Sequence, residues 1–458
     1  MLTPQVRKGI KRHHVSDGGC VVPAEDNQAI TGASGSTVLA ACLVVLFAGP
    51  ADAAGLKPRA PGSHAPVRLC VIPPLALAPI YVTPEPVAAD DEDEDDEEDE
   101  DEDEDEETVR GMLDPASGTC IALSGALTGS MQGAWMGLPA RIGSRGLDIT
   151  TFSVTSTMKL TTLSKLADGT EMRTSFGMLA QPVTDSEPQG LQVVEAFVGI
   201  GGWNAGYGAS TFNFWGGDEF LFGARIPARS AQQVSHTWQI TEGWAVSLAM
   251  ENGRGDTTAQ RPATLQPLPG LRWPDAVAKA SYWSDTLQVH LAGAITERAG
   301  ADGKASRVGV AAIAGTTYAL DLFGRPQRLT AQVAGAVDAP LYLGTQVDVR
   351  VVRSFVDVGD ATRGFSAVVS SSRDWTDQLT TNVYASMLRL DFPELGARSG
   401  RAEMWRGAAN IVFSPVKGMR FGLEGGLSRA RIDLPNRIIT NDPSGRQKTA
   451  VLWFSRSF

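Results

Sequence analysis

The chain has 458 residues, of which 43% are apolar and 20% are charged, and its mean hydropathy is close to zero. This length suffices for two or three average domains or for one large barrel. No run of about 18 apolar residues occurs, so the sequence predicts no membrane-spanning helix. The formal net charge is −12, but 18 of the 52 acidic residues form one unbroken run, Asp90–Glu107. Without that run, 40 bases face 34 acids, so the rest of the chain is mildly basic, at about +6.

The N-terminal 53 residues have the features of an export signal. A basic stretch at residues 7–12 precedes the apolar run Val38–Ala48, which is too short to span a membrane. Ala51–Ala53 has the A-x-A pattern, so cleavage is predicted after Ala53. The basic stretch lies unusually far from the apolar run, which leaves an over-extended start as an alternative. A lipoprotein cleavage box ending at Cys42 is another alternative, although the apolar run continues past it.

Two of the four cysteines remain after cleavage of the signal. Cys70 and Cys120 form an even pair in an exported, oxidising context, which favours a disulfide. A zinc site would need more ligands, and His64 is the only histidine near them in the sequence.

Residues 54–119 are expected to form a largely disordered periplasmic segment. Residues 54–89 are rich in proline, and Asp90–Glu107 follows directly. Like charges at this density repel one another and cannot bury a core. Three interpretations stay open: a solvated linker, loose divalent-cation binding between Asp90 and Glu107, or electrostatic docking on the basic remainder. No EF-hand spacing is present, so any cation binding would be non-specific.

From residue 120 to the end, short segments alternate between apolar and small or polar residues. Three clear examples are Trp244–Met250, Thr286–Ile295 and Leu379–Met387. A period of two predicts strands, and the contrast between their two faces suits lipid on one side and a polar lumen on the other.

Tight turns alternate with longer polar segments along the same region. Longer segments are expected at about residues 253–273, 298–306, 339–363, 389–401 and 433–447. This rhythm is typical of an outer-membrane barrel, and we predict an all-β transmembrane antiparallel β-barrel of about sixteen strands over residues 120–458. A soluble sandwich is the alternative. Aromatic residues near strand ends are expected to form interfacial girdles: Trp244, Tyr282, Trp283, Trp375 and Trp453.

The last segment, Thr449–Phe458, is predicted to be the closing strand of the barrel. It should pair with the first strand, near Ile121–Trp135, and so remove both sheet edges. Ser455 and Ser457 should face the lumen. Arg456 falls on the lipid side, where it can reach the headgroups. The outward residues are expected to be Leu452, Phe454 and Phe458, and Phe454 and Phe458 are expected to act as the C-terminal assembly signal.

Residues 120–458 resemble the porins of alphaproteobacteria, which are general diffusion porins. Asn410–Gly426 is similar to that family's penultimate hairpin with a W-S-P-V-K-G-type turn, although Phe413 stands where the family often has Trp. Ala196–Trp215 is similar to the strand pair leading into the pore loop. A cysteine pair followed by Ile121–Gly125 is also shared, but the interval between the cysteines is stretched here.

The resemblance implies a homotrimer of barrels in the outer membrane of a Gram-negative bacterium. Each barrel would be a passive water-filled channel for small hydrophilic solutes and ions, without a cofactor, assembled by machinery that reads the C-terminal strand. The third external loop, about Thr211–Gln233, would fold into the pore and face basic side chains of the wall. The predicted constriction residues are Asp218, Glu219, Arg225 and Arg229 on the loop, and Lys159, Arg173 and Arg406, chosen by strand parity, on the wall.

Functions from other classes are less well supported by the sequence. An outer-membrane hydrolase would need a nucleophile with a base, and His236 and His290 are the only barrel histidines. His290 faces the lumen by parity, and no G-x-S-x-G motif or metal-binding histidine pair occurs. We therefore expect neither an enzyme nor a nucleic-acid-binding protein. The alternative function is a structural or adhesive anchor whose acidic arm binds cations or a periplasmic partner.

Overall fold

A computed structural model describes most of the region predicted to form the barrel. The described residues are 69–72, 109–137, 147–181, 190–252, 273–299, 306–344, 363–395, 398–433 and 445–458. The predicted signal peptide, the acidic run and most of the proline-rich segment lie outside them. None of the helical structure in these ranges is long and apolar enough to cross a membrane.

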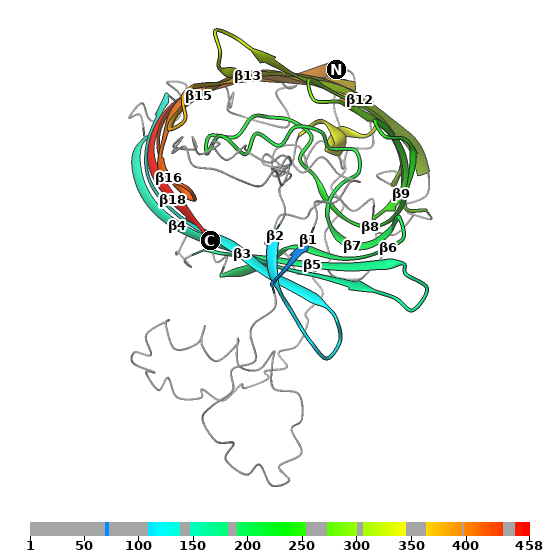
Figure 1. The fold of residues 1–458 in the computed structure, drawn as a ribbon. Helices are drawn as coiled ribbons and strands as arrows, with labels where there is room; N and C mark the ends of the chain where they lie inside the picture. Colours follow the sequence, from blue (N-terminus) through cyan, green and yellow to red (C-terminus); the bar gives the residue numbers. More distant parts are fainter. Residues whose placement is uncertain are drawn as a thin grey trace, which may run out of the picture. The chain divides into compact units, whose positions relative to one another are not determined.

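Sixteen antiparallel strands, β3 to β18, form a closed ring in which each strand pairs with its neighbours in sequence (Figure 1). Two short strands, β1 and β2, precede the ring, and a 3-10 helix, η1, lies between β13 and β14. The bounds are β1 Leu69–Ile72, β2 Val109–Leu113, β3 Cys120–Gly137, β4 Leu147–Lys165, β5 Glu171–Ala180, β6 Leu191–Ile200, β7 Trp203–Ala209, β8 Ser230–Thr241, β9 Trp244–Glu251, β10 Asp275–Trp283, β11 Leu287–Ala299, β12 Ser306–Asp321, β13 Pro326–Val337, η1 Pro340–Leu343, β14 Arg363–Thr376, β15 Leu379–Leu395, β16 Arg398–Val416, β17 Met419–Asp433 and β18 Gly445–Ser457.

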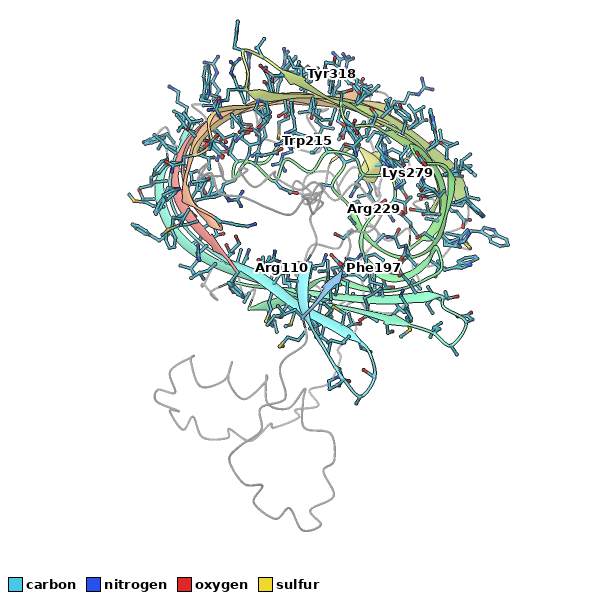
Figure 2. The ribbon with its side chains drawn as sticks, viewed as in Figure 1. Arg110, Phe197, Trp215, Arg229, Lys279 and Tyr318 are labelled. Carbon is cyan, nitrogen blue, oxygen red and sulfur yellow. A yellow bond between two sulfur atoms is a disulfide. The ribbon has the colours of Figure 1, made fainter. Side chains whose placement is uncertain are left out.

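The two faces of the wall follow the predicted alternation. In β11, Leu291 and Ile295 are exposed on the outside, whereas His290 and Ala292 are buried on the inside. The strands β9 and β15 alternate in the same way. In these strands, the exposed apolar side chains lie on the face where lipid is the expected solvent, and the side chains of the inner face are mostly buried. Figure 2 shows Tyr318 outside the ring and Trp215 inside it.

The connections also differ between the two ends of the barrel. Tight turns join β4 to β5, β8 to β9 and β16 to β17, and Gly169 and Gly418 occupy left-handed turn positions with φ of 85° and 74°. The opposite end carries the long connection between β7 and β8. One expectation was wrong: residues 389–401 are mostly strand, because β15 runs to Leu395 and β16 begins at Arg398.

The barrel closes between β18 and β3, as predicted. The register pairs Ser457 with Ala126, and Phe458 and Gly125 exchange two backbone hydrogen bonds of 2.9 and 3.0 Å. Arg456 does face outward, but its Nη1 donates to the Lys417 carbonyl oxygen at 2.8 Å and so ties the strand to the neighbouring turn.

Trp453 is a correction to the predicted aromatic girdle. Its side chain is only 8% exposed and lies on the inner face, over Gly422. A Cβ at Gly422 would lie 2.1 Å from the Trp453 ring, so the glycine makes room for it. Trp244 and Trp375 are exposed near strand ends, where interfacial aromatics belong.

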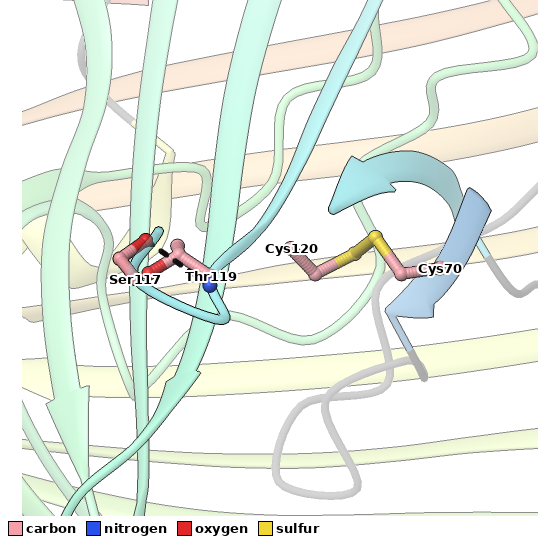
Figure 3. Close-up of a disulfide and its surroundings, with 4 residues drawn as sticks. All are labelled: Cys70, Ser117, Thr119 and Cys120. Carbon is pink, nitrogen blue, oxygen red and sulfur yellow. Dashed lines mark hydrogen bonds between the residues drawn. A yellow bond between two sulfur atoms is a disulfide. The ribbon is translucent and has the colours of Figure 1, made fainter. Parts of the chain in front are cut away.

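A disulfide joins Cys70 to Cys120, as predicted, and attaches the short N-terminal hairpin to the barrel (Figure 3). β1 pairs with β2, and β2 continues through a turn into β3. Ile72 is buried against Cys120 and Ala122 on the inner face of β3. Ile72 pairs directly with Val109, so the two ends of the described hairpin lie side by side.

Candidate pore constriction

The connection between β7 and β8, residues 210–229, runs inside the ring of strands (Figure 1). We call it the inward loop. It is slightly shorter than the predicted Thr211–Gln233, because β8 already begins at Ser230. The loop is unusually aromatic, and these side chains are all buried: Phe212, Phe214, Trp215, Phe220 and Phe222. Their burial against the wall gives the loop a hydrophobic core of its own.

A buried carboxylate holds the start of the inward loop. Glu251 on β9 is fully buried and accepts hydrogen bonds from the Ser210 hydroxyl, at 2.7 and 2.9 Å, and from the Thr211 N–H at 2.8 Å. His290 Nε2 lies 3.2 Å from the Phe212 carbonyl oxygen. Charged acceptors make stronger hydrogen bonds than neutral ones, so Glu251 is well suited to fix the loop entrance.

The middle of the loop lies on β12 and β13. Gln332 Oε1 accepts a hydrogen bond of 2.9 Å from the Trp215 N–H. Gly315, which pairs directly with Gln332, leaves space for the Phe214 ring. A Cβ at Gly315 would lie 2.1 Å from that ring, so this approach requires glycine.

A second buried carboxylate holds the far part of the loop. Glu424 on β17 accepts hydrogen bonds from the backbone N–H groups of Leu221, at 3.0 Å, and Phe222. Asn410 Nδ2 donates to the Glu219 carbonyl oxygen at 2.6 Å. Like Glu251, Glu424 satisfies two loop donors that would otherwise be buried without partners.

Aromatic and guanidinium groups complete this attachment. The Tyr384 hydroxyl donates to the Phe222 carbonyl oxygen. Arg406 donates to the Gly223 carbonyl oxygen at 2.6 Å and lies 4.3 Å over the Phe222 ring. Arg406 therefore lies beneath the loop, whereas the sequence had suggested that it faces the loop across the lumen.

The end of the loop is held by an ion pair. Arg229 is 1% exposed, pairs with Asp275 at 2.9 Å and donates to the Asn252 carbonyl oxygen at 2.6 Å. Its guanidinium also lies 4.6 Å over the ring of Tyr342 in η1, and the Tyr342 hydroxyl donates to Asp275. Removing one member of such a buried pair costs about 3–5 kcal/mol, because the other charge is left uncompensated. Arg229 is thus enclosed by protein, and it lies inside the ring of strands (Figure 2).

The two predicted acids lie on the part of the loop that is less enclosed. Asp218 is exposed, and Glu219 is half-buried with its Oε2 lacking a hydrogen-bond partner among the described residues. Burial raises the pKa of Glu219 above its ordinary value, and nearby Arg328 partly offsets this effect. Arg328 faces the lumen from β13, on the same face as Gln332.

The remaining predicted bases lie on the other side of the ring. The loop contacts described above go to strands from β9 to β17, to η1 and to Asn252, whereas Lys159 is on β4 and Arg173 on β5. In a ring of sixteen strands, β5 lies halfway round from β13. Lys159 pairs with Glu195 at 3.2 Å, and the Ser175 hydroxyl donates to the same carboxylate.

The predicted constriction residues therefore fall into three groups. Asp218 and Glu219 lie on the open part of the loop, and Lys159 and Arg173 lie on the opposite wall. The others are packed between loop and wall: Arg225, which is buried with its Nε 3.3 Å from Met404 Sδ, together with Arg229 and Arg406. Their individual roles in the constriction stay predictions.

Sequence reasoning missed the side chains that fasten the loop. Glu251, Gln332 and Glu424 each stand on the inner face of a strand and are at least nine-tenths buried. Each occupies an inward-facing position in the alternation of its strand and carries a charged or amide group among small residues. This pattern could have identified them from the sequence. No cluster of three or more His, Cys, Asp or Glu suitable for a metal ion occurs within the described ranges.

Comparisons with known proteins agree with this architecture. The outer membrane channel DcaP of Acinetobacter baumannii is similar with a TM-score of 0.60 and 14% identity, over 76% of this chain and 99% of that chain. An anion-selective porin from Comamonas acidovorans has a TM-score of 0.49 at 10% identity, over 74% and 100% of the two chains. OmpF of Salmonella typhi has a TM-score of 0.49 at 12% identity, over 75% and 99%.

The comparison of sequences is less informative than that of structures. No protein-family model matches the chain, and no curated protein is similar to it in sequence. The predicted alphaproteobacterial family therefore stays a prediction. The likeness to DcaP and the closed ring of strands together confirm the predicted fold: the chain has the sixteen-strand barrel of bacterial outer-membrane channels.

Proposed function

We propose that the protein is an outer-membrane porin that lets small hydrophilic solutes and ions diffuse passively through a water-filled lumen. The observation that carries this proposal is the inward loop, which is fastened to one half of the wall by the buried carboxylates of Glu251 and Glu424. A loop fixed in this way would narrow the lumen from the half of the wall to which it is fastened. The narrowing would set the size limit for solutes.

The charges exposed at the narrowing would give the channel its selectivity. Asp218 and Glu219 lie on the loop, and Lys159 and Arg173 lie on the opposite wall. Acids on one side of a narrow pore and bases on the other create a transverse field that favours polar over apolar solutes. Lys159 pairs with Glu195, and Arg173 also interacts electrostatically with Glu195, so both are candidates for the basic side.

Single-channel recording in planar bilayers tests the proposed function. A porin gives stable conductance steps, and the reversal potential in a salt gradient gives its ion preference. A structural anchor with a plugged barrel would give no steps. Recording from protein that lacks Asp90–Glu107 would show whether the acidic run contributes to selectivity or to blockage.

Assembly and oligomeric state belong to the same proposal. We infer that the barrel forms homotrimers in membrane lipid and that the assembly machinery reads the C-terminal strand, where Phe454 and Phe458 face outward. Deleting Phe458 removes the residue that exchanges two hydrogen bonds with Gly125 at the closing seam. We expect a large fall in the yield of native trimers in membrane extracts and little change in the conductance of the channels that form. A normal trimer yield would contradict this inference.

A further inference from the structure

Four basic side chains gather on the outside of the barrel at the ends of β17 and β18. Arg429 and Arg431 on β17 and Arg446 and Lys448 on β18 are all exposed. We call them the rim bases. They share the outward face of their strands with Leu427 and Leu452, which are exposed to lipid in the proposed membrane position. Most of a barrel's lipid face is apolar, so a basic group on that face requires an explanation.

The register brings like charges together instead of separating them. Arg429 stands directly opposite Arg446, and Lys448 stands opposite Leu427, the second residue before Arg429 on the same face. Like charges directly opposite on antiparallel strands destabilise a sheet. Within the described part of the chain, the rim bases form no ion pair or side-chain hydrogen bond.

Neighbouring acids do not resolve this excess of positive charge. Glu403 stands opposite Arg431, but it accepts a hydrogen bond of 2.7 Å from Trp405 Nε1. Asp391 is shared between Arg389, at 2.9 Å, and Arg401, at 2.7 Å. Asp433, also exposed on the outward face of β17, stands opposite Arg401. At these outward ends of β15 to β18, the three acids Asp391, Glu403 and Asp433 are outnumbered by Arg389, Arg401 and the four rim bases, so an excess of positive charge is left for an external anion.

Tryptophans indicate the depth at which the rim bases lie. Trp405 stands opposite Arg429, and Trp135 stands opposite Lys448. Both are about half exposed on the outer face. Tryptophans on the lipid face of a barrel favour the boundary between acyl chains and headgroups. The rim bases are thus level with the headgroups, at the end of the barrel opposite the tight turns.

We propose that the rim bases bind the phosphate group of an anionic membrane lipid whose acyl chains lie along β17 and β18. This inference rests on the proposed membrane insertion. A phosphate between Arg429 and Arg446 would relieve their repulsion and accept paired N–H bonds from both guanidinium groups. The surface offers such a ligand both parts of its chemistry: bases for the phosphate, and Leu427 and Leu452 for the chains.

Native mass spectrometry of the full-length protein, purified in neutral detergent, tests the proposal. The probes are phosphatidylglycerol and phosphatidylcholine, which differ in net charge at the headgroup. Wild type should retain phosphatidylglycerol preferentially. Each base near an anionic surface contributes roughly fivefold to binding, so Arg429→Gln/Arg446→Gln should reduce the preference about 25-fold. Arg110→Gln/Lys417→Gln, which removes two charges near the other end of the barrel, should leave the preference intact.

Several outcomes would overturn the assignment. Equal retention of both lipids by wild type would do so, as would an unchanged preference in Arg429→Gln/Arg446→Gln. Abolition of the preference by inorganic phosphate would assign the site to a free anion, and a change in oligomeric state alone would assign it to a second copy of the chain. Conductance is recorded from the same samples to test the proposed function separately. A channel that conducts but shows no lipid preference contradicts the lipid site and leaves the proposed porin function standing.

Discussion

The two halves of the lumen wall use their polar residues differently. From β9 to β17, the inward-facing polar groups Glu251, Gln332 and Glu424 are buried and bind the inward loop. From β4 to β6, Lys159 and Glu195 pair with each other and remain about one-third exposed. In the proposed channel, the first half would fix the shape of the lumen, and the second half would provide charged and hydroxyl groups to solutes.

This difference shows why charge alone does not identify a pore-lining residue. Arg229 and Arg173 are both basic and both face the inside of the barrel, yet Arg229 is enclosed with Asp275 and Tyr342. A buried, paired guanidinium stabilises the loop and contributes little to the field in the lumen. The two halves should consequently respond to mutation in different ways.

The largest effect is expected from releasing the loop at both attachment points. Glu251→Ala/Glu424→Ala leaves buried loop N–H groups without acceptors, and each costs about 1–3 kcal/mol. The loop should detach, so single-channel conductance should rise and thermal stability should fall. Glu251→Gln/Glu424→Gln keeps one acceptor oxygen at each site and a side chain of the same size, so it should release the loop less than the alanine variant and serves as the comparison. Wild-type conductance in the alanine variant would show that the loop does not narrow the pore.

A smaller effect is expected from disturbing the middle of the same half. Gly315→Ala places a Cβ against the Phe214 ring, and such overpacking costs about 1–3 kcal/mol. Thermal unfolding, measured by heat modifiability on gels, should show this loss of stability. Gly335→Ala is the control, because its Cβ would meet no atom within 4 Å. Equal melting of the two variants would contradict close packing of the loop at Gly315.

Substitutions of charges on the opposite wall and on the open part of the loop should change ion selectivity and leave stability almost unaltered. Arg173→Gln removes a base from the proposed constriction and should shift the reversal potential in the direction of greater cation preference. Asp218→Asn should shift it toward anions. The change in permeability ratio should be at most about fivefold, which corresponds to ~1 kcal/mol for close charges in water. Shifts of the same sign in the two variants would refute the proposed transverse field.

The smallest effect concerns pH. The raised pKa of Glu219 means that this carboxyl group gains a proton at a higher pH than an exposed glutamate. As pH falls, the loop loses negative charge and cation preference should weaken before ordinary carboxylates titrate. Reversal potentials measured along a pH series in wild type and in Glu219→Gln check this. If the change in cation preference with pH persists in Glu219→Gln, it arises from the titration of another group.

The strands were predictable from the sequence, because a wall between lipid and a polar interior imposes a period of two. That period correctly placed His290 inside and Leu452 outside, and the need to close a barrel correctly made β3 the partner of β18. The disulfide was predictable because Cys70 and Cys120 were the two cysteines expected to remain after export.

The contacts of the inward loop were not predictable in the same way. An irregular segment has no period, so nothing in the sequence separates the exposed Asp218 from the buried Arg229. The girdle assignment of Trp453 was wrong for a different reason. It followed from the position of Trp453 near a strand end, whereas parity along β18 already places Trp453 on the lumen face with Ser455, where Gly422 of the neighbouring strand leaves space for the ring.

Chemical modification of one loop position tests the central claim most directly. The described cysteines are joined in a disulfide, so Asp218→Cys introduces a reactive thiol at an exposed position of the loop. A bulky thiol reagent added during single-channel recording should reduce the conductance of Asp218→Cys and leave wild type unchanged. Unchanged conductance in Asp218→Cys, after mass spectrometry has verified complete labelling, would contradict the claim that the inward loop forms the constriction.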